Sequence, residues 1–218
     1  TVANVDPIPE AGANRITDEG TVLTFTGSVF DAGSADTHTG MWDFGDGTSD
    51  DSGSLSTSHA YADDGVYIVT LRVTDDDGGV GVDTLDVIVN NVAPSVNAGV
   101  DQTSDEGSQV DFAGSFTDPG VLDTHTFGWD FGDGGSDSGS LTTSHVFAAN
   151  GTYLVTLTVT DNDGGVGTDT LVMTVNNVAP TADAGGPYVI DQGSGVILDA
   201  SASSDPGMDI VLYEWDVD

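Results

Sequence analysis

The sequence predicts an all-β protein made of tandem β-sandwiches joined end to end, with a third, truncated sandwich at its C-terminal end. Three observations predict this architecture. The hexapeptide Trp-Asp-Phe-Gly-Asp-Gly occurs at Trp42–Gly47 and at Trp129–Gly134, and Trp215 begins an incomplete third copy. The tryptophans are 87 and 86 positions apart (129 − 42 and 215 − 129), so the chain is an array of repeats. Apolar and polar residues alternate in several segments, and no segment has helical periodicity.

Both complete copies contain the same expected strands in the same order. In copy one these are residues 23–25, the tryptophan strand before Asp43, residues 67–73 and residues 85–89. Copy two has them at residues 110–112, before Asp130, at 153–159 and at 171–175. A period of two indicates a strand with one buried face. Clusters of Gly, Asp, Asn and Ser separate the strands roughly every ten residues, which is typical of a β-sandwich.

Two kinds of aromatic residue have expected positions in such a sandwich. Trp42 and Trp129 are expected in the core, packed between the two sheets. Tyr67 and Tyr153 each follow a glycine by two positions, and they resemble the corner tyrosine of sandwich folds. Neither pair is therefore expected to bind a ligand.

The repeats also predict the domain boundaries. We expect residues 1–3 to end a preceding repeat, 4–90 to form repeat one, 91–176 repeat two, and 177–218 the first half of repeat three. Pro94 and Pro180 favour short extended linkers, so the array is expected to be a stiff rod. Half a sandwich cannot bury its own face. We therefore expect the polypeptide to continue at both ends, and completion of the half-repeat by another chain is the alternative.

Several long segments in a fixed order carry a family resemblance. After the tryptophan hexapeptide, copy one continues with Ser58–Tyr61 and Gly65–Asp75, and copy two with Ser144–Phe147 and Gly151–Asp161. Together these segments resemble the polycystic kidney disease (PKD) domain family. The resemblance implies immunoglobulin-like β-sandwiches of seven strands, and it covers nearly the whole chain.

The charge of the chain excludes some partners. The sequence has 37 acidic residues and two basic ones, with a formal net charge of −35. Such a surface repels nucleic acid and anionic membranes, and no apolar run reaches membrane-spanning length. Only four acids are glutamate, so 33 are aspartate (37 − 4). Asp-rich turns, a saline habitat and calcium binding are the three explanations, and the preference for the short aspartate side chain favours the first and the third.

The family resemblance implies a calcium site in each repeat. Some relatives in the PKD family bind calcium near the linker and the loop that precedes the tryptophan strand. The corresponding residues are Asn91, Asp118 and Asp123 in copy two, Asn4, Asp31 and Asp36 in copy one, and Asn177, Asp205 and Asp209 in copy three. Copy three lacks the Asp-Thr-His segment of the other two copies, which makes its site incomplete.

The order of the strands adds acids to this expected site. If the repeats join end to end, the hairpin turn Asp75–Gly79 lies at the same pole as the loop Ser28–Gly40 and the incoming linker. The candidate ligands therefore include Asp75, Asp77, Asp161 and Asp163. The turns at Glu19 and Asp63 are expected at the opposite pole, facing the acids of copy two. We predict at least one Ca²⁺ per repeat, although no loop matches an EF-hand and a simple Asp-Gly hairpin turn is the alternative.

Nothing in the sequence indicates an enzyme. All four histidines repeat, as His38/His125 and His59/His145, whereas a catalytic histidine should occur once and have a nucleophile as partner. The repeated Asp43 lies in a glycine-rich turn and is explained by turn chemistry. Known motifs for nucleophilic, phosphate or zinc chemistry are not found. The absence of cysteine is compatible with an extracellular protein.

The sequence therefore predicts a non-enzymatic segment of a long extracellular or cell-surface fibre, stalk or adhesin, stiffened by Ca²⁺ where repeats join. Its partners would be the neighbouring repeats and, in a fibre, other copies of the chain. Two alternatives are a polymer- or carbohydrate-binding module of a secreted enzyme and a self-assembling filament subunit completed by a neighbouring chain.

Overall fold

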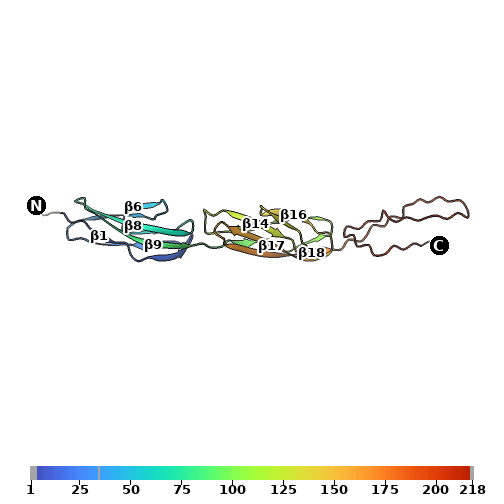
Figure 1. Ribbon diagram of the computed structural model, residues 1–218, viewed down its shortest axis with the longest axis horizontal. Helices are drawn as coiled ribbons and strands as arrows, with labels where there is room; N and C mark the ends of the chain where they lie inside the picture. The colour runs from blue at the N-terminus through green and yellow to red at the C-terminus, as the bar shows by residue number, and fades with distance from the viewer. Residues whose placement is uncertain (1–3, 34, 217–218) are drawn as a thin grey trace. The chain divides into compact units, whose positions relative to one another are not determined.

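A computed structural model describes residues 4–33 and 35–216 (Figure 1). Residues 1–3, expected to end a preceding repeat, and residues 217–218 lie outside the described ranges. The chain divides into two compact units, and the first contains residues 1–94 together with the loops 117–125 and 161–165 of copy two. The second contains residues 95–116, 126–160 and 166–218. The described ranges contain no helix long and apolar enough to cross a membrane.

The described residues of copy one form nine strands, in one large sheet and two small ones. The five-stranded sheet has the order β2 (Arg15–Asp18), β9 (Val80–Asn90), β8 (Gly65–Asp75), β5 (His38–Asp43) and β6 (Ser49–Gly53). Two pairs complete the copy: β1 (Ile8–Glu10) with β4 (Ser28–Phe30), and β3 (Leu23–Thr26) with β7 (Ser56–His59). Strands β2 and β9 are parallel, and the other pairs are antiparallel.

Copy two repeats this topology strand for strand. Its five-stranded sheet has the order β11 (Gln102–Asp105), β18 (Val166–Asn176), β17 (Gly151–Asp161), β14 (His125–Asp130) and β15 (Ser136–Ser138). The pairs are β10 (Ser95–Asn97) with β13 (Ser115–Thr117), and β12 (Gln109–Ala113) with β16 (Thr142–Val146). The predicted all-β tandem sandwich fold is therefore confirmed.

The expected seven strands become nine because two of them are interrupted. Strand β1 pairs with β4 whereas β2 pairs with β9, and Gly12 between them has φ of +105°, a conformation that favours glycine. Strands β3 and β4 are separated by Gly27, where a Cβ atom would collide with Leu71. Counting each interrupted pair as one strand restores seven.

The core of each copy follows the predicted alternation. Trp42 is fully buried and Trp129 is 2% exposed, and each indole packs against a buried phenylalanine, Phe25 at 5.6 Å and Phe112 at 5.8 Å between ring centroids. The hydroxyl of Tyr67 donates a hydrogen bond to the carbonyl oxygen of Asp63 at 3.0 Å, as expected of a corner tyrosine. The aromatic residues singled out in the sequence are thus structural.

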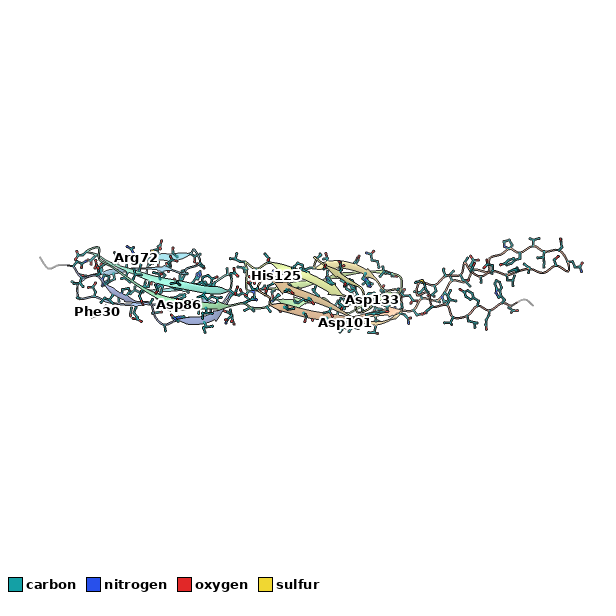
Figure 2. The ribbon with its side chains drawn as sticks, viewed as in Figure 1. Phe30, Arg72, Asp86, Asp101, His125 and Asp133 are labelled. Atoms are coloured by element: carbon teal, nitrogen blue, oxygen red, sulfur yellow. The ribbon has the colours of Figure 1, made fainter. Side chains whose placement is uncertain are left out.

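The repeated Asp-Gly turn is also structural. The ring of His59 stacks on Phe44 at 4.1 Å, and its Nε2 lies 2.6 Å from Asp46 Oδ2. His145 makes the same contacts with Phe131 and Asp133 in copy two. These histidines are therefore packed and hydrogen-bonded. Figure 2 shows Asp133 together with the exposed surface residues Asp86, Asp101 and Arg72.

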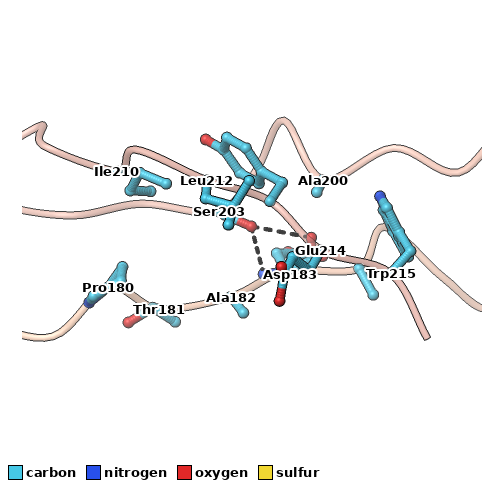
Figure 3. Close-up of a pocket in the computed structure, with 12 residues that line it drawn as sticks. Pro180, Thr181, Ala182, Asp183, Ala200, Ser203, Ile210, Leu212, Glu214 and Trp215 are labelled. Carbon is cyan, nitrogen blue, oxygen red and sulfur yellow. Dashed lines mark hydrogen bonds between the residues drawn. The ribbon is translucent and has the colours of Figure 1, made fainter.

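Residues 177–216 contain no strand within the described part of copy three, and only one isolated bridge joins Thr181 to Ser204. Trp215 is 41% exposed, in contrast to its buried counterparts Trp42 and Trp129. An open cavity of about 230 Å³ lies beside it (Figure 3). The cavity lining includes the apolar side chains of Ile210 and Leu212.

Candidate metal centre

Four predicted residues of copy one come together at one end of its sheet. Asp31, Asp36 and Asp75 each place a carboxylate oxygen within 4.8 Å of the others. Asn4 Nδ2 donates a hydrogen bond to Asp75 Oδ2 at 3.0 Å, which ties the start of the repeat to the β8–β9 turn. The turn, the loop before β5 and the incoming segment therefore meet as the strand order predicts.

Burial, hydrogen bonds and neighbouring charges shift the pKa values of the aspartates in this cluster. Asp75 is 5% exposed and accepts the backbone N–H groups of Asp77 at 3.0 Å and Gly79 at 2.7 Å. Burial alone would raise its pKa, but the hydrogen bonds from Asn4 and these backbone groups hold the pKa below its ordinary value. The pKa of Asp36 is raised, first by burial and then by the charge of Asp31.

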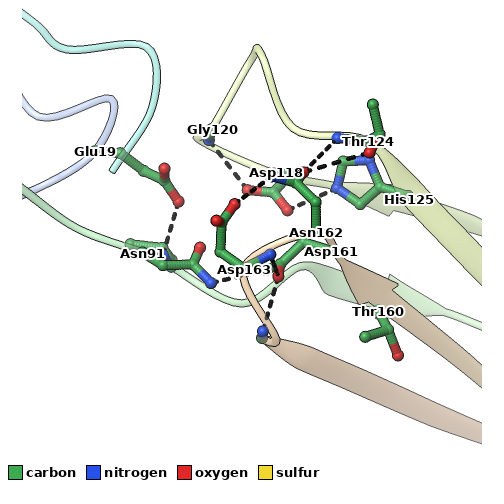
Figure 4. Close-up of polar contacts among 12 residues, drawn as sticks. Glu19, Asn91, Asp118, Gly120, Thr124, His125, Thr160, Asp161, Asn162 and Asp163 are labelled. Carbon is green, nitrogen blue, oxygen red and sulfur yellow. Dashed lines mark hydrogen bonds and ion pairs between the residues drawn. The ribbon is translucent and has the colours of Figure 1, made fainter. Parts of the chain in front are cut away.

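Copy two builds the same cluster from the equivalent residues (Figure 4). Carboxylate oxygens of Asp118, Asp123 and Asp161 lie within 4.8 Å of one another, and all three residues belong to the first compact unit. Asn91 Nδ2 donates to Asp161 Oδ2 at 3.0 Å, as Asn4 does to Asp75. His125 Nε2 lies 2.8 Å from Asp118 Oδ2 and orients that carboxylate.

The copy-two cluster contains more acceptors than donors. Both carboxylate oxygens of Asp123 are buried, as is Asn91 Oδ1, and none of the three has a hydrogen-bond partner among the described residues. Burial, followed by the negative charges of Asp118 and Asp163, raises the pKa of Asp123 to about 6. An excess of buried, unpaired oxygen atoms suits a hard cation such as Ca²⁺, which takes six to eight oxygen ligands.

The other predicted ligands lie outside these two clusters. Asp77 and Asp163 are exposed and contribute backbone N–H groups to Asp75 and Asp161, while the Asp163 carboxylate lies beside Asp63 and Asp64. In copy three, Asn177 and Asp209 are exposed and Asp205 is buried. Asp205 Oδ1 accepts the N–H of Gly207 at 2.8 Å, and its Oδ2 has no hydrogen-bond partner within the described ranges.

One buried acid was not among the predicted ligands. Glu19 is 2% exposed, and its Oε1 accepts the N–H of Val92 at 2.7 Å. Glu106 occupies the same position in copy two and accepts the N–H of Val178 at 2.7 Å. The sequence did contain a signal, because these are two of only four glutamates and both stand in the repeated Asp-Glu-Gly string.

A comparison with known families identifies the two complete repeats. A family model for the PKD domain matches residues 4–89 and again residues 91–175. The chain belongs to the PKD domain family. PKD domains are typically non-catalytic modules of extracellular or secreted proteins, so these PKD repeats form a non-catalytic repeat module.

Several solved PKD domains are similar to one repeat. The PKD1 domain of Vibrio anguillarum Epp is 30% identical and the match covers 39% of this chain and 96% of that domain, with a TM-score of 0.33. The PKD1 domain of Vibrio cholerae metalloprotease PrtV is 27% identical, with coverages of 39% and 99% and a TM-score of 0.33. The PKD domain of an M14-like peptidase from a Thermoplasmatales archaeon is 26% identical, with coverages of 40% and 98% and a TM-score of 0.36.

The raised pKa of Asp123 predicts a pH effect in the PKD repeats without metal. A pKa that is higher in the folded than in the unfolded chain stabilises the fold below about pH 4, and this stabilisation is lost as the pH rises through about 6. In the presence of a chelator, we expect the wild type to melt roughly 3 °C higher at pH 5 than at pH 7, relative to Asp123→Asn. Thermal unfolding followed by circular dichroism measures this difference. The same pH dependence in both proteins would contradict the prediction.

Proposed function

We propose that the chain is a structural segment of a longer extracellular or cell-surface fibre, stalk or adhesin, and that Ca²⁺ bound beside each linker stiffens it. The observation that supports this most is the repetition of one cluster. An asparagine from the linker and three aspartates from two loops recur in both copies, as Asn4 with Asp31, Asp36 and Asp75, and as Asn91 with Asp118, Asp123 and Asp161.

The chemistry of the donor set supports calcium over other metals. The side-chain groups are carboxylates and an amide, so every ligand atom would be an oxygen, which suits Ca²⁺. Two carboxylates about 4 Å apart repel by about 4 kcal/mol at an effective dielectric constant of 20. A divalent cation would convert this repulsion into attraction among Asp118, Asp123 and Asp161, and it would use the free oxygen of Asn91.

Stiffening would follow from the position of the asparagine. Asn91 comes directly after strand β9 and three residues before Pro94, so it belongs to the linker itself. A cation that binds Asn91 together with the loops 117–125 and 161–165 would restrict the φ and ψ angles of the linker. The proline already restricts its own φ and the conformation of the preceding residue.

The test is thermal unfolding of the 218-residue chain with Ca²⁺ and with a chelator at fixed ionic strength. A ligand that binds only the folded state stabilises it by about 2.7 kcal/mol when its free concentration is 100 times Kd. We therefore expect Ca²⁺ to raise the melting temperature of the PKD repeats by roughly 10 °C or more. Magnesium at the same concentration is the control, since it favours octahedral sites that keep several waters.

Two results would contradict the proposal. A melting temperature that does not move with Ca²⁺ would remove calcium from the function. An equal increase with sodium chloride alone would indicate charge screening of an acidic surface, as expected for a protein of a saline habitat. Amide hydrogen exchange at residues 90–93 tests the stiffening separately, because a restrained linker should exchange more slowly when Ca²⁺ is bound.

A further inference from the structure

Glu19 holds a buried carboxylate with one free oxygen. It lies in the turn between β2 and β3, and its backbone N–H donates to the carbonyl oxygen of Asn90 at 3.1 Å. One side-chain oxygen, Oε1, accepts the N–H of Val92, and Figure 4 shows Glu19 close to Asn91. The other, Oε2, is buried and has no hydrogen-bond partner in the described part of the chain. A buried carboxylate oxygen without a donor is unfavourable unless a cation or a water molecule satisfies it.

The surroundings of this free oxygen are acidic. Carboxylate oxygens of Glu19, Asp63 and Asp123 lie within 4.8 Å of one another. Each of two oxygens bound to one Ca²⁺ lies 2.3–2.6 Å from the ion, so this spacing matches ligands placed on opposite sides of a cation. The two basic residues of the chain are elsewhere, since Arg15 donates to the carbonyl oxygen of Thr24 and Arg72 is exposed on β8.

Glu106 of copy two can be compared directly with Glu19, because it occupies the same position in its repeat. Glu106 is equally buried and its Oε1 accepts the equivalent linker N–H, from Val178. Its Oε2, however, accepts the backbone N–H of Asn150 at 2.8 Å. Ala149 and Asn150 stand at the positions where copy one has Asp63 and Asp64. The peptide backbone thus satisfies the glutamate of copy two, whereas in copy one two extra acids stand beside a glutamate with a free oxygen.

We propose that Glu19, Asp63 and Asp123 bind a second divalent cation next to the one held by Asn91, Asp118 and Asp161. Asp123 would bridge the two ions, since both of its oxygens are buried and neither has a hydrogen-bond donor among the described residues. The inference rests on the proposed function, because Asp123 belongs to both sites. Asp64 and Asp163 lie beside Asp63 in a further group of carboxylates and would attract the ion.

This second site makes the repeats of the array unequal. It requires Asp63 in the repeat that precedes the linker, and Ala149 at the corresponding position of copy two offers no ligand. The linker after copy one would therefore hold two ions, and Glu106 after copy two would take no part in metal binding. The Asp-Asp-Gly or Ala-Asn-Gly sequence before the corner-tyrosine strand would determine the number of ions at each linker.

The number of Ca²⁺ ions bound by the 218-residue chain tests the proposal, measured by equilibrium dialysis and isothermal titration calorimetry. The double variant Asp63→Ala/Asp64→Asn gives copy one the residues that copy two already accommodates, so its fold should be retained. We expect it to bind one Ca²⁺ fewer than the wild type. The matched control, Asp51→Asn/Asp111→Asn, removes two charges from exposed strand positions and should bind the wild-type number.

Glu19→Gln provides an independent variant. Its amide oxygen can still accept the N–H of Val92, while an NH₂ group replaces the free oxygen. We expect the loss of the same single ion and no decrease in melting temperature with chelator present. An unchanged ion count in either the double variant or Glu19→Gln would overturn the second site. If Ca²⁺ still raised the melting temperature, the proposed function would stand, whereas a wild type that binds no Ca²⁺ would overturn both.

Discussion

Replacing Trp42 by alanine is expected to lower the free energy of unfolding of the first repeat by about 3–5 kcal/mol. The indole is fully buried in β5, and its ring packs at 5.6 Å from Phe25. It also fills the space beside Gly27, where a Cβ atom would lie 3.2 Å from its Cζ2. Alanine would leave a cavity between rigid strands that cannot move inward without breaking their ladders.

Urea unfolding followed by circular dichroism measures this loss of stability. The fluorescence of Trp129 follows the second repeat, which is unchanged and serves as the internal control. Trp42→Phe is a milder substitution at the same position and serves as a control. It should cost less than alanine, because the ring remains and the buried indole Nε1 has no hydrogen-bond partner among the described residues. Ile68→Ala, at a 60% exposed position on β8, should cost little. A loss below 1 kcal/mol for Trp42→Ala would contradict a core role.

The second large effect is expected at Asp161, in the absence of any metal. Its side chain is 6% exposed and accepts the N–H groups of Asp163 at 2.9 Å and Gly165 at 2.7 Å, in addition to Asn91 Nδ2. Asp161→Ala would leave three donors without an acceptor at the β17–β18 turn. With chelator present, we expect the melting temperature of the second repeat to fall by roughly 10 °C.

Two controls separate this structural role from metal binding. Asp161→Asn keeps one acceptor oxygen and should lose less stability, while Asp163→Ala changes an exposed neighbour and should alter the melting temperature by only a few degrees. Although burial raises it, the pKa of Asp161 is held below its ordinary value by hydrogen bonds from Asn91 and the turn. The stabilisation is therefore present above about pH 4 and lost as the pH falls further. Equal melting of Asp161→Ala and wild type in chelator would contradict it.

Much of the fold could be predicted because its signals are local. Alternation along the chain identified the buried faces of β8 and β17, and the glycine two residues before Tyr67 identified the corner tyrosine. The interruptions of the first two strands were not predicted, since they depend on which sheet each half joins. That choice depends on partners far away in sequence, such as Phe30 for Ile8 and Ile88 for Ile16.

The candidate metal site could be predicted less completely than the fold. The family resemblance and the strand order placed Asn91, Asp118, Asp123 and Asp161 at one pole, and the structure brings these four together. The strand order placed Glu19 at the pole that faces copy two, but Glu19 was not predicted as a ligand, because an acid in a turn is usually explained by hydrogen bonds to nearby backbone groups. Its burial and the lack of a donor for its Oε2 could be read only from the tertiary structure.

The amino-acid sequence by itself determined the repeat, the sandwich class, the core tryptophans and the extreme negative charge, because these depend on composition and on patterns within a few residues. Only the tertiary structure decided which carboxylates share a cluster and which oxygen atoms lack a donor. The physical reason is that a hydrogen bond or a metal contact requires atoms within about 3 Å. In this fold, residues about 70 positions apart meet that condition, as Asn4 and Asp75 do. The free oxygen of Glu19 and the satisfied one of Glu106 differ in this way, and the turns beside them also differ, with Asp63-Asp64 in copy one and Ala149-Asn150 in copy two.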